Sequence, residues 1–326
     1  MIRFKKPTFI IAEAGINHNG NLATAKKMIK KAADSGADAI KFQTIIPEEL
    51  FSEKENSTLF DMSKDWILSK NDHIELKKFA QKNKILFFST PFGIKSAKLL
   101  NELKIPIIKI ASGEITNHEL ISYIAKMGRP IILSTGMSEI SEIKSAVKII
   151  KSHKCHFAIL HCISSYPTTI TDCNLATIPY LEKLFKVPVG FSDHTEGLEA
   201  SLAAVSLGAS VIEKHFTLDK NMPGPDQKLS LDPHEFSNLS KQIRLIDNSL
   251  GVPRLKPLKS EKKFQKNMRK SVAASIDIPK NTVITNSMLN LIRPATGISP
   301  LSQNKIIGKK IKNSVKKGTI LKWNNF

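Results

Sequence analysis

The sequence predicts a (β/α)8 barrel followed by a small, mostly β domain. The first 250 of its 326 residues contain eight apolar runs of strand length, and each run is followed by a segment with helical periodicity. Eight strand-helix units in about 250 residues is the size expected of a (β/α)8 barrel. An open, doubly wound sheet is the alternative, but the chain has no glycine-rich dinucleotide-binding turn to support it.

The predicted strands are apolar runs separated by segments in which apolar residues recur every three or four positions. The strands cover residues 8–15, 37–44, 85–91, 107–114, 130–137, 157–164, 188–194 and 210–217. The helical pattern is clearest in residues 22–35, 138–152, 198–207 and 233–250. We therefore assign residues 1–250 to the barrel.

The C-terminal part of the chain differs from the predicted barrel in its sequence pattern and in its net charge. Residues 251–270 contain two prolines and many lysines, which indicates an exposed linker with a short helix. Residues 271–326 have short strand-like pieces at 272–274, 282–284 and 320–322, separated by Pro, Asn and Gly, which predicts a compact β domain. Residues 256–326 carry a net charge of +14, whereas the rest carries +6.

Composition narrows the classes of protein to consider. With 41% hydrophobic and 24% charged residues, the chain is neither disordered nor fibrous. Its three cysteines lack the spacing of a zinc knuckle or a redox motif. No apolar run approaches the ~18 residues of a membrane span, and residues 1–6 do not begin a signal peptide. We expect a soluble, cytoplasmic protein with no membrane partner.

The net charge of +20 comes mostly from lysine, because only six of the 49 basic residues are arginines. Nucleic-acid binding usually relies on arginine as well. We interpret the charge as lysine-rich codon usage, and expect no nucleic-acid partner.

Polar residues collect at nearly every predicted strand end, where a barrel enzyme builds its active site. Burying an unpaired lysine or glutamate costs roughly several kcal/mol, so these groups need partners or a ligand. The set includes Glu13, Lys41, Gln43, Ser89, Thr90, Lys109, Ser112, Glu114, Ser134, Ser164, Tyr166, Ser192, His194, Glu213 and His215.

His194 and His215 end the last two predicted strands. Neighbouring strands lie about 4.8 Å apart, so both imidazoles could reach one metal ion. Two histidines with oxygen donors suit Mn, Co, Zn or Fe better than Mg. Each could alternatively be a hydrogen-bonded core histidine, but two on adjacent strand ends favour a metal site.

Lys41 and Lys109, with nearby serines, would place two cations and several hydroxyls together at the mouth of the barrel. This pattern predicts an anion site, such as one for phosphate, whereas no P-loop supports nucleotide hydrolysis. A single strand-end lysine could instead form the Schiff base of an aldolase. Glu13, Glu114 and Glu213 are candidate acid-base groups, as is Asp226 in the polar loop of residues 219–230.

Several motifs in this order resemble the sialic acid synthase family, whose members condense phosphoenolpyruvate with an N-acylated mannosamine-type sugar. The resemblance covers essentially the whole chain. The barrel motifs are AEAGINHNG (12–20), KFQT (41–44), STPF (89–92), KIASGE (109–114), STGM (134–137), SSYPT (164–168), GFSDHT (190–195) and EKHFTLDKNMPGPDQKLSLDP (213–233).

The tail motifs RKSVAASIDIPKNTVIT (269–285) and RPATGISP (293–300) are similar to the antifreeze-like (SAF) domain of the same family. In that family this domain covers the partner's active site in a swapped homodimer. The resemblance therefore implies a homodimer in which Arg293 reaches the acyl group of the sugar.

Carried over by position, the resemblance implies a divalent metal, usually Mn2+ with Mg2+ or Co2+ as alternatives, on His194 and His215. It implies that Glu13, Glu114, Tyr166 and Asp226 contact the sugar or transfer protons. Ser164 stands where some members have asparagine. The expected phosphoenolpyruvate-binding residues are Lys41, Lys109, Ser112, Ser134, Ser164 and Ser192.

The acceptor sugar is the open question. N-acetylmannosamine would give N-acetylneuraminate, and we expect this acceptor. A 2,4-diacetamido-2,4,6-trideoxymannose would instead give legionaminate, and enzymes for either product share the GPD (224–226) and SGE (112–114) motifs. Two hypotheses from other functional classes are a Schiff-base lyase and a non-catalytic saccharide-binding protein.

Overall fold

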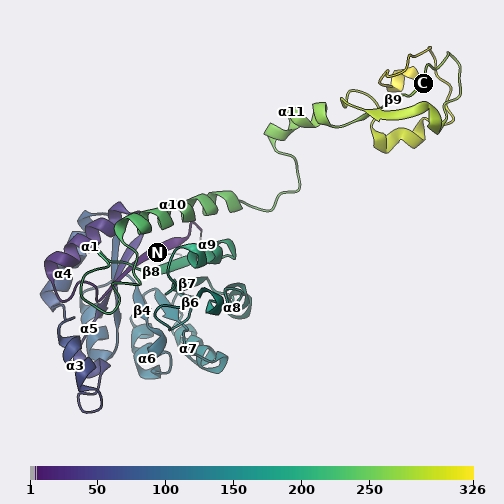
Figure 1. Ribbon diagram of the computed structural model, residues 1–326. Helices are drawn as coiled ribbons and strands as arrows, with labels where there is room; N and C mark the ends of the chain where they lie inside the picture. The colour runs from purple at the N-terminus through teal and green to yellow at the C-terminus, as the bar shows by residue number, and fades with distance from the viewer. Residues whose placement is uncertain (1–3, 5) are drawn as a thin grey trace. The chain divides into compact units, whose positions relative to one another are not determined.

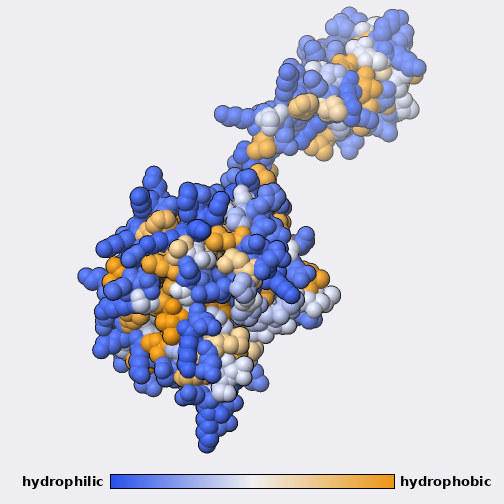
Figure 2. Space-filling view, turned by 60° about the vertical axis from the view of Figure 1, so that its left-hand side comes forward, coloured by the Kyte–Doolittle hydropathy of each residue, from blue (hydrophilic) through white to orange (hydrophobic). Residues whose placement is uncertain are grey.

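The computed structural model describes residue 4 and residues 6–326; the remaining N-terminal residues, part of the stretch considered above for a signal peptide, lie outside the described residues. Two compact units divide the chain, Met1–Gly251 and Val252–Phe326 (Figure 1). None of the described helices is both long enough and apolar enough to span a bilayer. Hydrophilic side chains cover most of the visible face of each unit (Figure 2).

The first unit is the closed eight-stranded parallel barrel that the sequence predicts, with strand order β1 to β8. Its strands are β1 (Phe9–Gly15), β2 (Ala39–Thr44), β3 (Leu86–Pro91), β4 (Ile108–Ile110), β5 (Ile131–Ser134), β6 (Phe157–Cys162), β7 (Val189–Asp193) and β8 (Val211–His215). Its helices are α1 (Leu22–Asp34), α2 (Pro47–Leu50), α3 (Ser57–Lys64), α4 (Lys70–Lys82), α5 (Ile94–Glu102), α6 (His118–Lys126), α7 (Ile140–Ser152), α8 (Thr177–Phe185), α9 (Glu199–Ser206) and α10 (Pro233–Leu250).

All eight strands are shorter than their predicted ranges, and β4 and β5 differ most because the chain turns immediately after their apolar residues. β4 ends at Ile110, and Ser112–Glu114 forms a short 3-10 helix. β5 ends at Ser134, and Met137 adopts a left-handed backbone conformation with φ of 60°. Some polar residues of the KIASGE (109–114) and STGM (134–137) motifs therefore lie in loops beyond the strand ends and not on the strands themselves.

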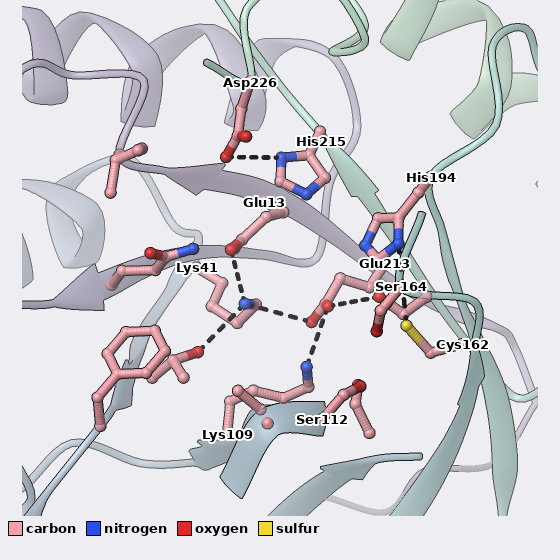
Figure 3. Close-up of a pocket in the computed structure, with 18 of the residues that line it drawn as sticks. Glu13, Lys41, Lys109, Ser112, Cys162, Ser164, His194, Glu213, His215 and Asp226 are labelled. Carbon is pink, nitrogen blue, oxygen red and sulfur yellow. Dashed lines mark hydrogen bonds and ion pairs between the residues drawn. The ribbon is translucent and has the colours of Figure 1, made fainter. Parts of the chain in front are cut away.

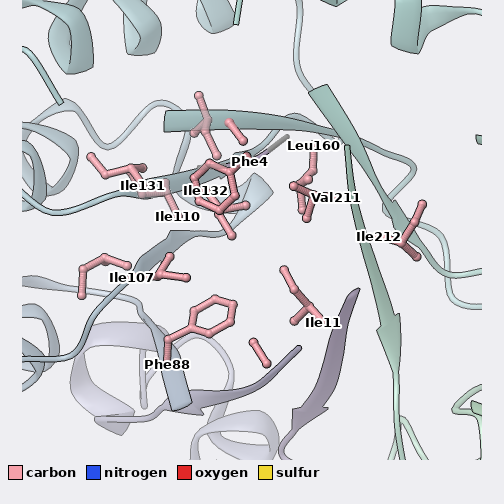
Figure 4. Close-up of a cluster of buried hydrophobic side chains, with 14 of the residues drawn as sticks. Phe4, Ile11, Phe88, Ile107, Ile110, Ile131, Ile132, Leu160, Val211 and Ile212 are labelled. Carbon is pink, nitrogen blue, oxygen red and sulfur yellow. The ribbon is translucent and has the colours of Figure 1, made fainter. Parts of the chain in front are cut away.

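Apolar side chains fill the barrel and the layer between strands and helices. Ile11, Phe88, Ile132 and Leu160 are fully buried, and Figure 4 shows them in one cluster with Ile212. Burying each such side chain contributes about 1.5–3 kcal/mol, so the core holds the strand ends in place.

Side chains on β7 and β8 point alternately into the barrel and toward the helices, and their charged residues are divided between these two sides. Ser192 of β7 and Glu213 of β8 line the cavity at the barrel mouth. Asp193 and Lys214, the next residues, form a buried ion pair of 3.0 Å, and Asp193 accepts a hydrogen bond from Ser201 of α9. Since successive residues of a strand point to opposite faces, this pair lies on the helix side of the wall.

The second unit contains α11 (Lys259–Met268) and an antiparallel pair, β9 (Ser271–Ala274) and β10 (Leu289–Ile292). The predicted strands at 282–284 and 320–322 form only single bridges, Val283 to Lys310 and Ala273 to Ile320, because turns interrupt the pairing. β10 was not expected from the sequence. A separate apolar core that includes Val272, Ile306 and Leu321 stabilises this unit.

Gly190 on β7 packs closely against its neighbouring strands, β6 and β8, and a larger side chain there should destabilise the barrel. A Cβ atom there would overlap the Val211 carbonyl oxygen and lie 2.7 Å from Leu160 Cδ2. We expect Gly190→Ala to lower the free energy of unfolding by about 1–3 kcal/mol, measured by urea titration. Gly113→Ala is the control, because its Cβ would meet nothing within 4 Å. Equal stability of the two variants would contradict this account of the packing.

Candidate active site

A cavity of about 420 Å³ opens at the carboxyl ends of the barrel strands, and every strand contributes a side chain to its lining. A (β/α)8 enzyme has its active site at this end of the barrel. The strand residues that line it are Glu13, Lys41, Gln43, Thr90, Lys109, Ser134, Cys162, Ser192, Glu213 and His215.

Two lysines and two glutamates form a buried charge cluster on the cavity floor (Figure 3). Lys41 Nζ lies 2.8 Å from Glu13 Oε1 and 3.7 Å from Glu213 Oε2. Lys109 Nζ lies 3.1 Å from Glu213 Oε1, which also accepts a 2.9 Å hydrogen bond from Ser192. Glu213 therefore joins the two lysines.

The cluster drives the pKa values of its two carboxyl groups apart. Burial raises the pKa of Glu13 to about 7, although Lys41 opposes the shift. Burial also favours the neutral form of Glu213, but Lys109 and Lys41 outweigh it and lower the pKa of this carboxyl to about 2. Near neutral pH, Glu213 is a fixed anion whereas Glu13 can gain or lose a proton.

Several buried polar atoms on the cavity surface have no hydrogen-bond partner among the described residues. They are Glu13 Oε2, Ser134 Oγ and Glu213 Oε2. Leaving such an atom unsatisfied costs about 1–3 kcal/mol. The arrangement therefore fits a polar ligand that supplies the missing hydrogen bonds.

His194 and His215 lie at the rim of the cavity with their ring centroids 5.4 Å apart. His194 Nδ1 lies 2.7 Å from the Ile163 carbonyl oxygen, so this nitrogen carries the proton and Nε2 keeps its lone pair. Burial lowers the pKa of His215, which favours the neutral ring. His215 Nδ1 has no hydrogen bond within the described part of the chain, and Asp226 Oδ2 lies 3.7 Å away.

These features fit a divalent metal, because neutral imidazoles with free lone pairs are its common ligands. The described residues contain no group of three His, Cys, Asp or Glu side chains arranged to hold a metal ion. A metal on the two histidines would therefore take its other ligands from water or a substrate.

The structure brings together most of the site residues predicted from the sequence. Ser112, Ser164, Tyr166 and Asp226 line the cavity with the strand residues above. The ring centroids of Tyr166 and His194 lie 4.2 Å apart, and the Tyr166 residue is 53% exposed.

Two predicted residues are not among those that line this cavity of the first unit. Glu114 does not line the cavity: it lies in the 3-10 helix after β4 and accepts a 2.8 Å hydrogen bond from Asn117. Burial raises the pKa of its carboxyl group. Arg293 belongs to the second unit, directly after β10. Its role stays a prediction.

Other lining residues received a smaller role from the sequence, or none. Thr90 and Gln43 were visible only as polar strand ends, whereas Glu213, one of the candidate acid-base groups, proves to be the centre of the charge cluster. Cys162 also lines the cavity, with its sulfur 3.9 Å from His194 Nδ1. An apolar group escaped notice because such residues resemble ordinary core positions: Ile16, Leu50, Phe51, Trp66 and Phe92.

Comparison with known proteins identifies the family of each unit. The NeuB family model matches residues 28–254, and the SAF domain model matches residues 269–326. The chain is 44% identical over 319 residues to the N,N'-diacetyllegionaminic acid synthase of Campylobacter jejuni, covering 93% of this chain and 96% of that one. It is 39% identical over 332 residues to the enzyme of the same name from Legionella pneumophila, covering 97% and 93%.

A solved structure extends the likeness to three dimensions. The N-acetylneuraminic acid synthetase of Leptospira borgpetersenii, crystallised with citrate, matches with a TM-score of 0.76 and 42% identity over 79% of this chain and 90% of that one. Since the family model covers more than half of the chain, the chain belongs to the NeuB family of sialic acid synthase-type enzymes and carries a C-terminal SAF domain.

Proposed function

We propose that this protein condenses phosphoenolpyruvate with the open-chain aldehyde of an N-acylated mannosamine-type sugar and releases phosphate. The observation that carries the proposal is the cavity itself, in which two buried lysines and unsatisfied hydroxyl and carboxylate oxygens lie beside two histidines with available nitrogens. Family membership supports the same reaction class.

Phosphoenolpyruvate would occupy the sector of the mouth formed by β4 to β7. Lys109, Ser112, Ser134, Ser164 and Ser192 all line this sector. Lys41 reaches the cluster from β2 through its contacts with Glu13 and Glu213. The two lysines would neutralise the phosphate and carboxylate, and the hydroxyls would donate hydrogen bonds to their oxygens.

The acceptor aldehyde would lie at His194 and His215. A divalent metal held by these rings, with Mn2+ as our expectation, would polarise the aldehyde oxygen and stabilise the charge that develops there. Tyr166 and Asp226 flank the histidines and would contact the sugar hydroxyls.

The reaction then needs one new carbon-carbon bond, one water and one proton carrier. C3 of phosphoenolpyruvate attacks the aldehyde carbon, whose oxygen takes up a proton to become a hydroxyl. Water adds at C2, and phosphate leaves with cleavage of the bond between C2 and oxygen. Of the two protons that the water loses, one balances the proton taken up by the aldehyde oxygen and the other goes to the departing phosphate, so that C2 becomes a ketone. We assign Glu13 to proton transfer, because its pKa of about 7 lets it exchange protons near neutral pH. Glu114 stays a sequence-based expectation.

A Schiff-base lyase is the second candidate, and one observation favours it. Burial lowers the pKa of Lys109, which would make the neutral, nucleophilic amine more accessible. Both lysines are nevertheless engaged in ion pairs with carboxylates, and this arrangement suits charge neutralisation better.

The choice of acceptor, the cytoplasmic location and the swapped homodimer are proposals as well. N-acetylmannosamine, expected from the sequence, and the 2,4-diacetamido sugar both belong to the acceptor class. A basic SAF domain carrying Arg293 and placed over an anionic substrate would be electrostatically favourable.

The first prediction tests the reaction. Metal-stripped protein should release little phosphate from phosphoenolpyruvate, and Mn2+ should restore release in the presence of N-acetylmannosamine or the diacetamido sugar. His215→Ala should stay folded by circular dichroism and lose at least about 100-fold in kcat, because one ligand position is missing.

Metal-independent turnover with trapping by borohydride and pyruvate would replace this mechanism with the Schiff-base one. Near-normal turnover of His215→Ala would show that this histidine is structural.

The second prediction concerns pH. Below pH 7 the Glu13 carboxyl is mostly neutral, and above pH 7 it ionises and repels an anionic substrate. We expect the KM for phosphoenolpyruvate to rise several-fold between pH 6 and 8 beyond the effect of the substrate's own ionisation. Glu13→Gln cannot ionise and should show only the substrate's own pH dependence. Parallel profiles for both proteins would contradict the assigned pKa.

The third prediction tests domain exchange. Arg293→Ala should raise the KM for the sugar about tenfold or more without changing the KM for phosphoenolpyruvate, because only the acyl contact is lost. Mixing unfolded Arg293→Ala and His215→Ala chains and refolding them together should regenerate activity, since one barrel in each mixed dimer has both residues. Absence of recovery, with each variant refolding normally alone, would place Arg293 in its own subunit's site or outside any site.

A further inference from the structure

The cavity lining includes a group of apolar residues that the proposed reaction does not use. We define the apolar wall as Ile16, Leu50, Phe51, Trp66 and Phe92, all of which line the cavity. Ile16 follows β1, Phe92 follows β3, and the other three lie in the segment between β2 and β3 that contains α2 and α3. Ile16 is buried and the other four are half-buried.

The order of strands around the closed barrel separates this wall from the rest of the site. Apart from Lys41 of β2, the proposed phosphoenolpyruvate residues come from the β4 to β7 sector, and the two histidines lie directly after β7 and at the end of β8. A sugar whose aldehyde carbon lies at the histidines would then extend over the β1 to β3 sector. The far end of its carbon chain would meet the apolar wall.

Three polar groups of this sector converge on one spot beside Gly15. A Cβ atom on Gly15 would lie 3.4 Å from Glu13 Oε1, 3.5 Å from Gln43 Nε2 and 3.6 Å from Asp226 Oδ2. Asp226 Oδ2 also lies 3.7 Å from His215 Nδ1, so this spot adjoins a histidine and its groups would bind hydroxyls in the middle of the sugar. The wall adds aromatic and aliphatic surface to the lining of the same cavity.

The two acceptors differ at the end that would meet this surface. N-acetylmannosamine has hydroxyls at C4 and C6, which would lose hydrogen bonds to water against an apolar wall. The 2,4-diacetamido-2,4,6-trideoxy sugar has a methyl group at C6 and an acetamido methyl at C4, which gain from leaving water.

We infer that the apolar wall binds the C4 to C6 end of the acceptor and selects a 6-deoxy sugar with an N-acyl group at C4 over N-acetylmannosamine. This inference rests on the proposed function and favours the acceptor that the sequence analysis gave as the alternative. Apolar pockets discriminate against an added hydroxyl by about 100-fold and against single methylenes by about 10- to 200-fold. We expect a preference in kcat/KM of about 10- to 200-fold.

The test measures phosphate release by the full-length protein with Mn2+, phosphoenolpyruvate and each of the two sugars. Trp66→Ser removes apolar surface at a half-buried position, and Phe51→Ser does so independently. Met62→Ser is the matched control, because Met62 lies on α3 in the same segment, is 42% exposed and does not line the cavity.

Wild-type protein and Met62→Ser should both prefer the diacetamido sugar at least tenfold. Trp66→Ser and Phe51→Ser should each reduce that preference at least fivefold, through a higher KM for the diacetamido sugar. Their kcat values and their KM for phosphoenolpyruvate should change less than twofold, which a general loss of folding would not produce.

Three outcomes would overturn the inference. Equal or better use of N-acetylmannosamine by the wild-type protein would do so while leaving the proposed function intact. An unchanged preference in both wall variants would locate acceptor choice elsewhere. Absence of phosphate release with either sugar would overturn the proposed function itself, and the inference with it.

Discussion

The pairing of four charged side chains inside the barrel mouth is the constraint on which the site depends. Glu13, Lys41, Lys109 and Glu213 are each less than 5% exposed. A buried charge without a partner costs several kcal/mol, so removing one member would leave the others uncompensated. Each strand end that carries a member must therefore hold its place, and the apolar core below makes this possible. The two unsatisfied carboxylate oxygens leave the cluster ready to exchange contacts with a ligand.

Side-chain alternation along β7 and β8 also stabilises the two histidines, through an ion pair on the helix side of the barrel wall. Asp193 and Lys214 precede His194 and His215 and form their ion pair on the helix side of the wall. Lys214 also donates a 2.6 Å hydrogen bond to the Thr195 carbonyl oxygen, just beyond His194. The backbone on both sides of His194 is thereby fixed to β8. A two-residue period thus places the reactive groups inside and their support outside.

Sequence reasoning located the barrel and most of the site because both depend on short-range patterns. An apolar run that ends in Lys41 or Lys109 is visible without any knowledge of tertiary structure. The central role of Glu213 was not, because it depends on contacts with two strands distant in sequence. Pairing in the small domain was mostly missed, since single bridges such as Val283 to Lys310 leave no periodic signal. Trp66 and the other wall residues have no polar signature at all.

Reaction and acceptor choice arise from physically separate parts of the chain. The four residues of the charge cluster, together with Ser134 and Ser192, sit on barrel strands, where register and core packing fix them to one another. Trp66 and Phe51 come instead from the segment between β2 and β3, whose helices α2 and α3 lie outside the barrel repeat. Substitutions in that segment can change the surface that meets the sugar without moving the lysines or histidines. A barrel that keeps its strand ends can therefore retain one condensation chemistry while a single loop segment adapts it to sugars that differ at C4 and C6.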